Sequence, residues 1–71
     1  MAEEVRAEMV ANIAKVTVAP GEQVEAGSTI VILESMKMEI PVLCEFAGTV
    51  TAVHVQEGDV VQEGDVIAEI A

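Results

Sequence analysis

An internal repeat constrains the fold of this chain more than any other feature. Residues 16–30 match residues 53–67 at a constant offset of 37. The clearest matched positions are Gly21/Gly58, Val24/Val61, Gly27/Gly64 and Ile30/Ile67. Each copy reads Val-x-Val-x-x-Gly-acid-x-Val-x-x-Gly-x-x-Ile. A repeat of this kind indicates two equivalent structural units within one fold.

The repeated pattern predicts β-strands joined by glycine turns. Valines alternate at positions 16 and 18 and again at 53 and 55, which is the two-residue period that places side chains on one face of a strand. Glycine tolerates the positive φ angles that tight turns often need. Because β-branched residues dominate and no apolar pattern of helical period is sustained, we expect no helix.

Neither copy can bury its apolar face alone, so we expect the two units to pack face to face. The predicted fold is all-β, a flattened barrel or sandwich of two four-stranded antiparallel sheets with pseudo-two-fold symmetry (a barrel-sandwich hybrid). With 71 residues, the chain is expected to form one domain, 1–71. The expected strands are residues 4–10, 12–18, 23–25, 29–35, 38–43, 48–55, 60–62 and 65–70.

The composition limits how so small a core can be stabilised. Hydrophobic residues make up 52% of the chain but aromatic residues only 1%, so aliphatic side chains must fill the core. The single cysteine, Cys44, cannot form an internal disulfide, and a single histidine, His54, leaves no Cys/His set for a structural zinc ion. We expect no metal site, a buried Cys44 and an exposed His54 in a strand.

The acidic charge excludes several classes of partner. The formal net charge is −10, which repels phosphates and anionic membrane surfaces, so neither nucleic acid nor membrane binding is expected. The N-terminus lacks the basic start and apolar run of a signal peptide, and no stretch approaches the roughly 20 apolar residues of a membrane span. Together with the unpaired cysteine, this predicts a cytoplasmic protein. We also expect the chain to be monomeric in isolation.

The candidate functional segment is the turn between the expected strands 29–35 and 38–43. If Met36 and Lys37 form the turn, the flanking pairs are Ser35 with Met38, Glu34 with Glu39 and Leu33 with Ile40. The segment contains no glycine, asparagine or aspartate, although two-residue hairpin turns favour positive φ angles. The paired glutamates also place like charges across the ladder. A turn built from unfavourable residues indicates that it is kept for function.

Lys37 is the candidate reactive residue of this turn. The two other basic residues, Lys15 and Arg6, both lie in expected strands. Methionine ordinarily fills gaps in a core, but at a hairpin tip Met36 and Met38 would form a soft, adaptable recognition surface. The repeat places the chain ends where a second hairpin tip would be, so they are expected at the pole opposite Lys37, which leaves the lysine unobstructed.

The chain resembles the biotin/lipoyl attachment domain family over essentially its whole length. The segment Glu34-Ser35-Met36-Lys37-Met38-Glu39 looks like the biotin attachment signature, although the family commonly has alanine where this chain has serine. The repeated Gly-acid-x-Val-x-x-Gly pattern also looks like that of the family, with Gly48 matching the glycine that opens the second half. The short Ala19-Pro20-Gly21-Glu22 connection resembles compact members without an inserted loop, which implies a small stand-alone biotinylated carrier.

This resemblance implies a carrier with no catalytic acid or base of its own. Biotin would be the covalent cofactor, and a biotin protein ligase would join it as an amide to Lys37. Met36 and Met38 would be flanking recognition residues, and Glu34, Ser35 and Glu39 would form the rim of the hairpin. The arm would then carry a carboxyl group between the biotin carboxylase and carboxyltransferase subunits of a carboxylase.

Three other functions remain open at this point. A lipoyl carrier would share the fold and the lysine, although lipoyl domains usually flank that lysine with acidic and small aliphatic residues. An interaction module of the same fold would need no modified lysine. An enzyme would need Cys44 and His54 as nucleophile and base, but nothing in the sequence brings them together or supplies a third, orienting residue.

Overall fold

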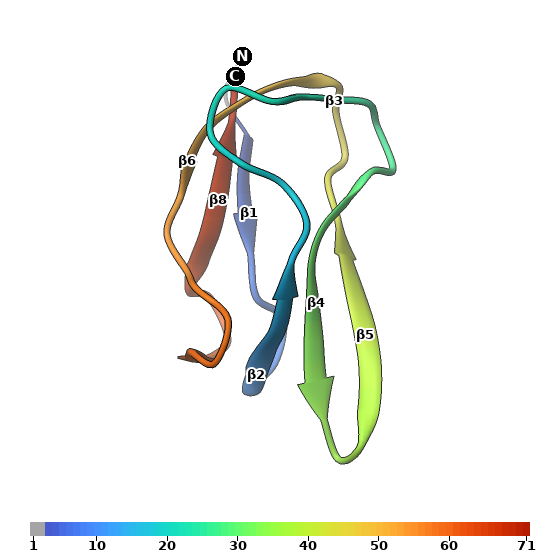
Figure 1. The fold of residues 1–71 in the computed structure, drawn as a ribbon, viewed down its shortest axis with the longest axis vertical. Coiled ribbons are helices and arrows are strands. Elements are labelled where there is room, and N and C mark those ends of the chain that lie inside the picture. Colours follow the sequence, from blue (N-terminus) through green and yellow to red (C-terminus); the bar gives the residue numbers. More distant parts are fainter. Residues whose placement is uncertain (1–2) are drawn as a thin grey trace.

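The computed structural model describes residues 3–71, which form two antiparallel sheets (Figure 1). The eight strands are β1 (Glu3–Arg6), β2 (Ala11–Val16), β3 (Gln23–Val24), β4 (Thr29–Ser35), β5 (Met38–Leu43), β6 (Gly48–Val53), β7 (Val60–Val61) and β8 (Val66–Ile70). One four-stranded sheet has the order β1-β8-β6-β3 and the other β5-β4-β2-β7. The predicted all-β architecture is confirmed, and residues 3–71 contain no helix.

The two sheets are equivalent under the sequence repeat. The offset of 37 residues takes β1 to β5, β2 to β6, β3 to β7 and β4 to β8, so it converts the strand order of one sheet into that of the other. Backbone hydrogen bonds follow the same rule: Gly21 N donates to Val50 O at 2.7 Å, and Gly58 N donates to Ile13 O at 2.8 Å. The predicted pseudo-two-fold symmetry is confirmed, and each sheet contains strands from both copies.

The glycines of the repeat supply a backbone conformation rather than space. Gly21 and Gly58 have φ angles of 92° and 93°, and Gly27 and Gly64 have 86° and 91°. A Cβ atom at any of the four would meet no other atom within 4 Å. Glycine is therefore needed at these turns because L-residues with side chains rarely adopt positive φ.

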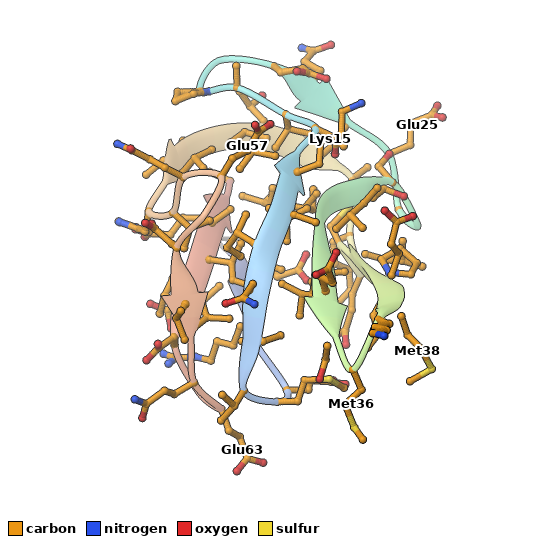
Figure 2. All side chains as sticks on the ribbon, turned by 60° about the horizontal axis from the view of Figure 1, so that its bottom comes forward. Lys15, Glu25, Met36, Met38, Glu57 and Glu63 are labelled. Carbon is orange, nitrogen blue, oxygen red and sulfur yellow. The ribbon has the colours of Figure 1, made fainter. Side chains whose placement is uncertain are left out.

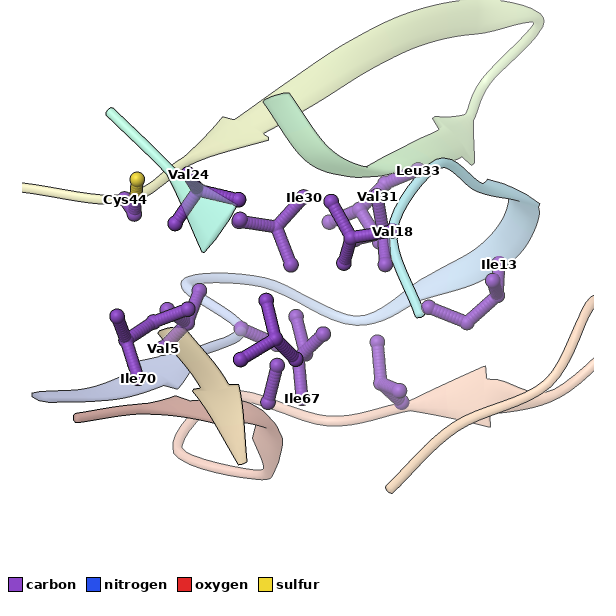
Figure 3. Close-up of a cluster of buried hydrophobic side chains, with 14 of the residues drawn as sticks. Val5, Ile13, Val18, Val24, Ile30, Val31, Leu33, Cys44, Ile67 and Ile70 are labelled. Atoms are coloured by element: carbon purple, nitrogen blue, oxygen red, sulfur yellow. The ribbon is translucent and has the colours of Figure 1, made fainter. Parts of the chain in front are cut away.

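The core between the sheets is aliphatic, as the composition predicts (Figure 3). Its largest fully buried side chains are Ile13, Ile30, Leu33, Ile67, Ile70, Val31 and Val50. The matched residues Ile30 and Ile67 are both completely buried, so the two copies contribute equivalent contacts. Full burial of a side chain of this size stabilises a fold by roughly 1.5–3 kcal/mol, which makes this cluster the main source of cohesion between the sheets.

The expected strand at residues 4–10 is too long, because residues 7–10 form a bent connection. Ala7 leaves the ladder of β1 and bonds to the turn that follows β7. Its N–H donates to Asp65 O at 2.9 Å, and its carbonyl accepts from Gly64 N at 2.8 Å. The chain then crosses to the other sheet, where β2 begins at Ala11.

Two other expected strands also end too late, at equivalent places in the repeat. β2 ends at Val16 rather than at residue 18, and β6 ends at Val53 rather than at residue 55. At both places the chain turns toward the neighbouring sheet, and the next N–H groups, of Thr17 and His54, still bond to Ile30 O and Ile67 O at 3.1 and 2.8 Å. His54 is exposed, as expected, but lies just beyond its strand. All remaining strand boundaries agree within one residue.

The molecule is elongated, with extents of 33 × 18 × 17 Å. The β4–β5 hairpin forms one pole, and both chain ends lie at the other (Figure 1). Glu3 pairs with Ile70 in the ladder between β1 and β8, which holds the two ends together. The predicted position of the ends, opposite Lys37, is confirmed. Residues 3–71 include no helix long and apolar enough to cross a membrane.

Candidate functional site

The hairpin between β4 and β5 has the predicted register. The pairs are Ser35 with Met38, Glu34 with Glu39 and Leu33 with Ile40. Met36 and Lys37 form the turn, with φ angles of 53° and 65°, and they are the two non-glycine residues with positive φ among the described residues. Each L-residue in this left-handed region costs about 1–2 kcal/mol. The fold therefore holds Lys37 in an unfavourable backbone conformation.

The two methionines beside Lys37 project into solvent. Met36 is 88% exposed and Met38 is 58% exposed, and Figure 2 shows both side chains pointing away from the sheets. They contribute nothing to the core, so the ordinary packing role of methionine does not explain them. Exposed, flexible thioethers suit a surface that adapts to a partner.

The amine of Lys37 is accessible and engages no neighbour. Its residue is exposed, and neither of the two ion pairs among residues 3–71 includes it. These pairs are Arg6–Glu4 and His54–Glu69, each at 2.6 Å. The hydrogen bonds of the described side chains also leave Lys37 Nζ unengaged. A primary amine displayed in this way can enter the active site of another protein.

The rim of the hairpin is acidic. Glu34 and Glu39 are exposed and face each other across the ladder, while Ser35 is half-buried. A groove of about 580 Å³ runs between the edge strands β1 and β5 and is not lined by Met36, Lys37 or Met38. The hairpin tip therefore presents its side chains to solvent rather than enclosing them in a pocket.

Cys44 and His54 do not form a catalytic pair. Cys44 is 2% exposed, and its Sγ donates to Glu25 O at 3.0 Å. His54 Nε2 lies 2.6 Å from Glu69 Oε2 on the exposed surface. The two side chains thus bond to different partners. Within residues 3–71, no group of three or more His, Cys, Asp or Glu side chains could hold a metal ion.

Sequence reasoning missed two exposed valines at the hairpin pole. Val10 is 64% exposed in the connection before β2, and Val60 is 65% exposed in β7. The signal that could have found them is a comparison of the two copies at surface positions, because the offset of 37 matches Val10 with Ala47 and Val60 with Gln23.

The chain matches the protein family described as "Biotin-requiring enzyme" over residues 3–70. It is 56% identical over 71 residues to the "Biotinylated protein TB7.3 homolog" of Mycobacterium leprae, which covers 100% of both chains. It is 48% identical over 64 residues to the "Biotin/lipoyl attachment protein" of Bacillus subtilis, which covers 90% of this chain and 88% of that protein.

A solved structure shares the same fold. The urea carboxylase of Kluyveromyces lactis superposes with a TM-score of 0.93 and 35% sequence identity. The superposition covers 100% of this chain and 6% of the urea carboxylase chain. The similarity therefore concerns one small part of that enzyme.

Proposed function

The chain belongs to the family of biotin-requiring enzymes, and from this premise we propose that it is a biotin carrier in which Lys37 is the attachment residue. One observation carries the proposal. Lys37 lies at the tip of a positive-φ turn, between two exposed methionines, with its amine unengaged by the described side chains. The chain supplies an attachment point and no catalytic group.

The residues of the hairpin fit a covalently attached biotin. Amide formation needs a primary amine that a ligase can enclose, and the exposed Lys37 at one pole of the molecule meets that need. Met36 and Met38 flank the amine with adaptable apolar surface. The three residues of the tip are exposed and do not line the groove between β1 and β5, which leaves an attached group free to reach other active sites.

The chain has two chemical roles: Lys37 forms one amide bond, and the fold determines where that bond is placed. The ligase joins biotin to AMP from ATP, with release of pyrophosphate. The ammonium group of Lys37 gives up a proton, its nitrogen attacks the carboxyl carbon of this acyl-adenylate, and AMP and a second proton leave as the amide forms. Attached biotin supplies a ring nitrogen that takes up and releases a carboxyl group. The strained turn and exposed pole hold the attachment point away from the sheets, which raises the local concentration of the arm at a partner's active site.

The partners that follow from this role are a biotin protein ligase and the biotin carboxylase and carboxyltransferase subunits of a carboxylase, in the cytoplasm. The similarity to a segment of a urea carboxylase supports a carboxylase context. The acidic surface, with a net charge of −10, suits docking to basic rims around such active sites.

Intact-mass analysis tests the proposal directly. The protein is expressed with a biotin protein ligase and biotin, alongside the variants Lys37→Arg and Lys15→Arg. We expect the mass of one biotinyl group on the wild type and on Lys15→Arg, and no increment on Lys37→Arg. A lipoyl increment, no increment on the wild type, or biotin retained by Lys37→Arg would refute the proposal.

A further inference from the structure

The two sheets end in four edge strands, and β5 is the longest of them (Figure 1). The strand orders β1-β8-β6-β3 and β5-β4-β2-β7 place β1, β3, β5 and β7 at the ends. β3 and β7 have two residues each and β1 has four, whereas β5 has six. An edge strand presents unpaired N–H and C=O groups that can pair with a strand of another molecule. Because β5 offers more of these groups than the other three edges, it is the edge that most needs protection.

Backbone hydrogen bonds show which residues of β5 point to the open side of the strand. Cys44, directly after β5, bonds toward the chain that leads into β4. Its N–H donates to Ser28 O at 3.1 Å, and its carbonyl accepts from Gly27 N at 2.9 Å. Backbone groups that face the neighbouring strand alternate with groups that face away along an antiparallel ladder, so every second residue before Cys44 also faces β4. The remaining three residues face the open side: Glu39, Pro41 and Leu43.

Pro41 occupies the middle of this open side. It is exposed, and proline has no N–H, so the three outward positions carry two donors rather than three. The neighbouring edge strand β1 does not cover them, because a groove lined by residues of both strands separates β1 from β5. A strand added to β5 would leave the carbonyl opposite Pro41 without its donor, which is unfavourable once water is excluded. Pro41 therefore interrupts the longest open edge at its centre.

The residues around Pro41 would otherwise favour pairing with another strand. Ile40, Val42 and Leu43 are apolar, and Leu43 is 49% exposed. Short segments with high β-propensity, few charges and no proline are the ones that pair edge to edge and aggregate. In the repeat, the position equivalent to Pro41 is Glu4 of β1. Charged residues and prolines both protect strand edges, so each copy of the repeat has a protecting residue at the same position.

We propose that Pro41 prevents the open edge of β5 from pairing with the same edge of a second copy of this chain, and thereby keeps the hairpin accessible. Two copies of one antiparallel strand pair about a two-fold axis, so that each presents the same residues to the other. If the axis passes through residue 41, the two prolines face each other. Both donors at the centre of the new ladder are then missing, which blocks the pairing at the point where it would be centred.

The same pairing would obstruct the candidate attachment site, and this part of the inference rests on the proposed function. β5 begins at Met38, directly after Lys37. In a pair centred on residue 41, each residue lies opposite the one that is equally far from residue 41 in the other copy. Residues 44–46 of the second copy would therefore run alongside residues 36–38 of the first. Each hairpin tip would lie beside the body of the other copy, where a ligase could not enclose it.

The test replaces proline by threonine, which restores the N–H and favours a strand. Sedimentation of unmodified wild type, Pro41→Thr and Pro20→Thr is measured at protein concentrations from about 10 µM to about 1 mM. We expect the average mass of Pro41→Thr to rise by up to about twofold over this range, because dimers form by mass action. The masses of the wild type and of Pro20→Thr should stay constant. Pro20 is the matched control, since it is exposed and lies in a turn outside the strands.

Hydrogen exchange then identifies the surface that associates. In Pro41→Thr, the amides of residues 39, 41 and 43 should exchange about tenfold more slowly at high than at low protein concentration, because pairing protects them. The exposed amides of the turn at residues 57 and 58, which lies outside the strands, should show no such dependence. Pro41→Ala restores the N–H with a smaller side chain, and it repeats both measurements if the threonine variant has a lowered melting temperature.

The outcomes separate this inference from the proposed function. Monomeric Pro41→Thr and Pro41→Ala at about 1 mM, or dimers in which residues 39–43 gain no protection, would overturn the role of Pro41 whether or not Lys37 accepts biotin. An undiminished rate of biotinylation in the dimer would overturn the obstruction of the hairpin. A wild-type protein that accepts no biotin would refute the proposed function, while association of the Pro41 variants would still support edge protection.

Discussion

Glu34 and Glu39 face each other across the ladder of β4 and β5, one pair removed from the pair that flanks the turn. Both are exposed, and no cation among residues 3–71 forms an ion pair with either of them. Like charges placed directly opposite destabilise an antiparallel pair. The hairpin therefore combines strain in its turn with repulsion in its stem, and both features lower its stability.

Glu39→Gln should stabilise the protein by about 0.2–1 kcal/mol, because it removes the repulsion from Glu34 and leaves the strand unchanged. The gain should shrink at 1 M salt, where the Debye length falls to about 3 Å. Urea denaturation at low and high salt measures both effects. Glu57→Gln, at an exposed acid of another turn, is the control; an equal gain for this variant would attribute the effect to net charge.

Lys37→Gly should raise the free energy of unfolding by about 1 kcal/mol, because glycine adopts the φ angle of 65° at this position without the cost borne by lysine. Lys15→Gly, at an exposed lysine inside β2, should lower it, since glycine weakens a strand interior. Thermal and urea denaturation of the two variants decide the sign. A loss of stability in both would show that the turn is not strained.

Gly48→Ala should destabilise the protein by about 1–3 kcal/mol. A Cβ atom at residue 48 would lie 2.5 Å from Ala71 O and 2.8 Å from Ile70 Cγ2. The backbone of Ala71 cannot yield cheaply, because it exchanges hydrogen bonds of 2.7 and 2.8 Å with Thr49. Without such a contact, Gly→Ala usually stabilises a protein by reducing the entropy of the unfolded chain, so a rise in melting temperature would contradict this packing.

The sequence predicted the sheets and the hairpin correctly because repeat and alternation are local signals of β-structure. It failed at residues 7–10, which are bent in the structure although they were expected to belong to the first strand. The bend there depends on bonds from Ala7 to a turn more than 50 residues away, which a local pattern does not contain. The repeat does indicate the end of this strand. Residues 7–10 correspond to residues 44–47, which lie between the expected strands 38–43 and 48–55.

The candidate site was predictable at its tip and unpredictable at its flank. Lys37 and its methionines form one continuous segment, whereas Asn12 and Val60 join the same face only through the pairing of β2 with β4 and β7. Register between distant strands depends on tertiary packing. The position of Val60 beside Asn12 and the hairpin therefore became visible only with the three-dimensional arrangement.

The two turns of the second copy contain matched side-chain hydrogen bonds. Asp59 Oδ2 accepts from Gln56 N, and Asp65 Oδ2 accepts from Gln62 N, both at 2.9 Å. In each turn the aspartate N–H also donates to the backbone carbonyl of the same glutamine, at 3.0 Å. A side-chain bond and a backbone bond thus close each turn together. The carboxylates therefore help to fix the turn that contains Gly58 or Gly64 and precedes the next strand.

Asp59→Ala and Asp65→Ala should each lower the free energy of unfolding by about 0.5–1.5 kcal/mol, the net value of one such hydrogen bond. Glu57→Ala and Glu63→Ala are matched controls, because they remove the same charge from the same turns but no described hydrogen bond. On a chain with a net charge of −10, loss of an acid relieves repulsion and is itself mildly stabilising. The difference in the free energy of unfolding between each aspartate variant and its glutamate control therefore isolates the hydrogen bond. Equal unfolding curves for the two variants of a pair would show that the backbone alone stabilises the turn.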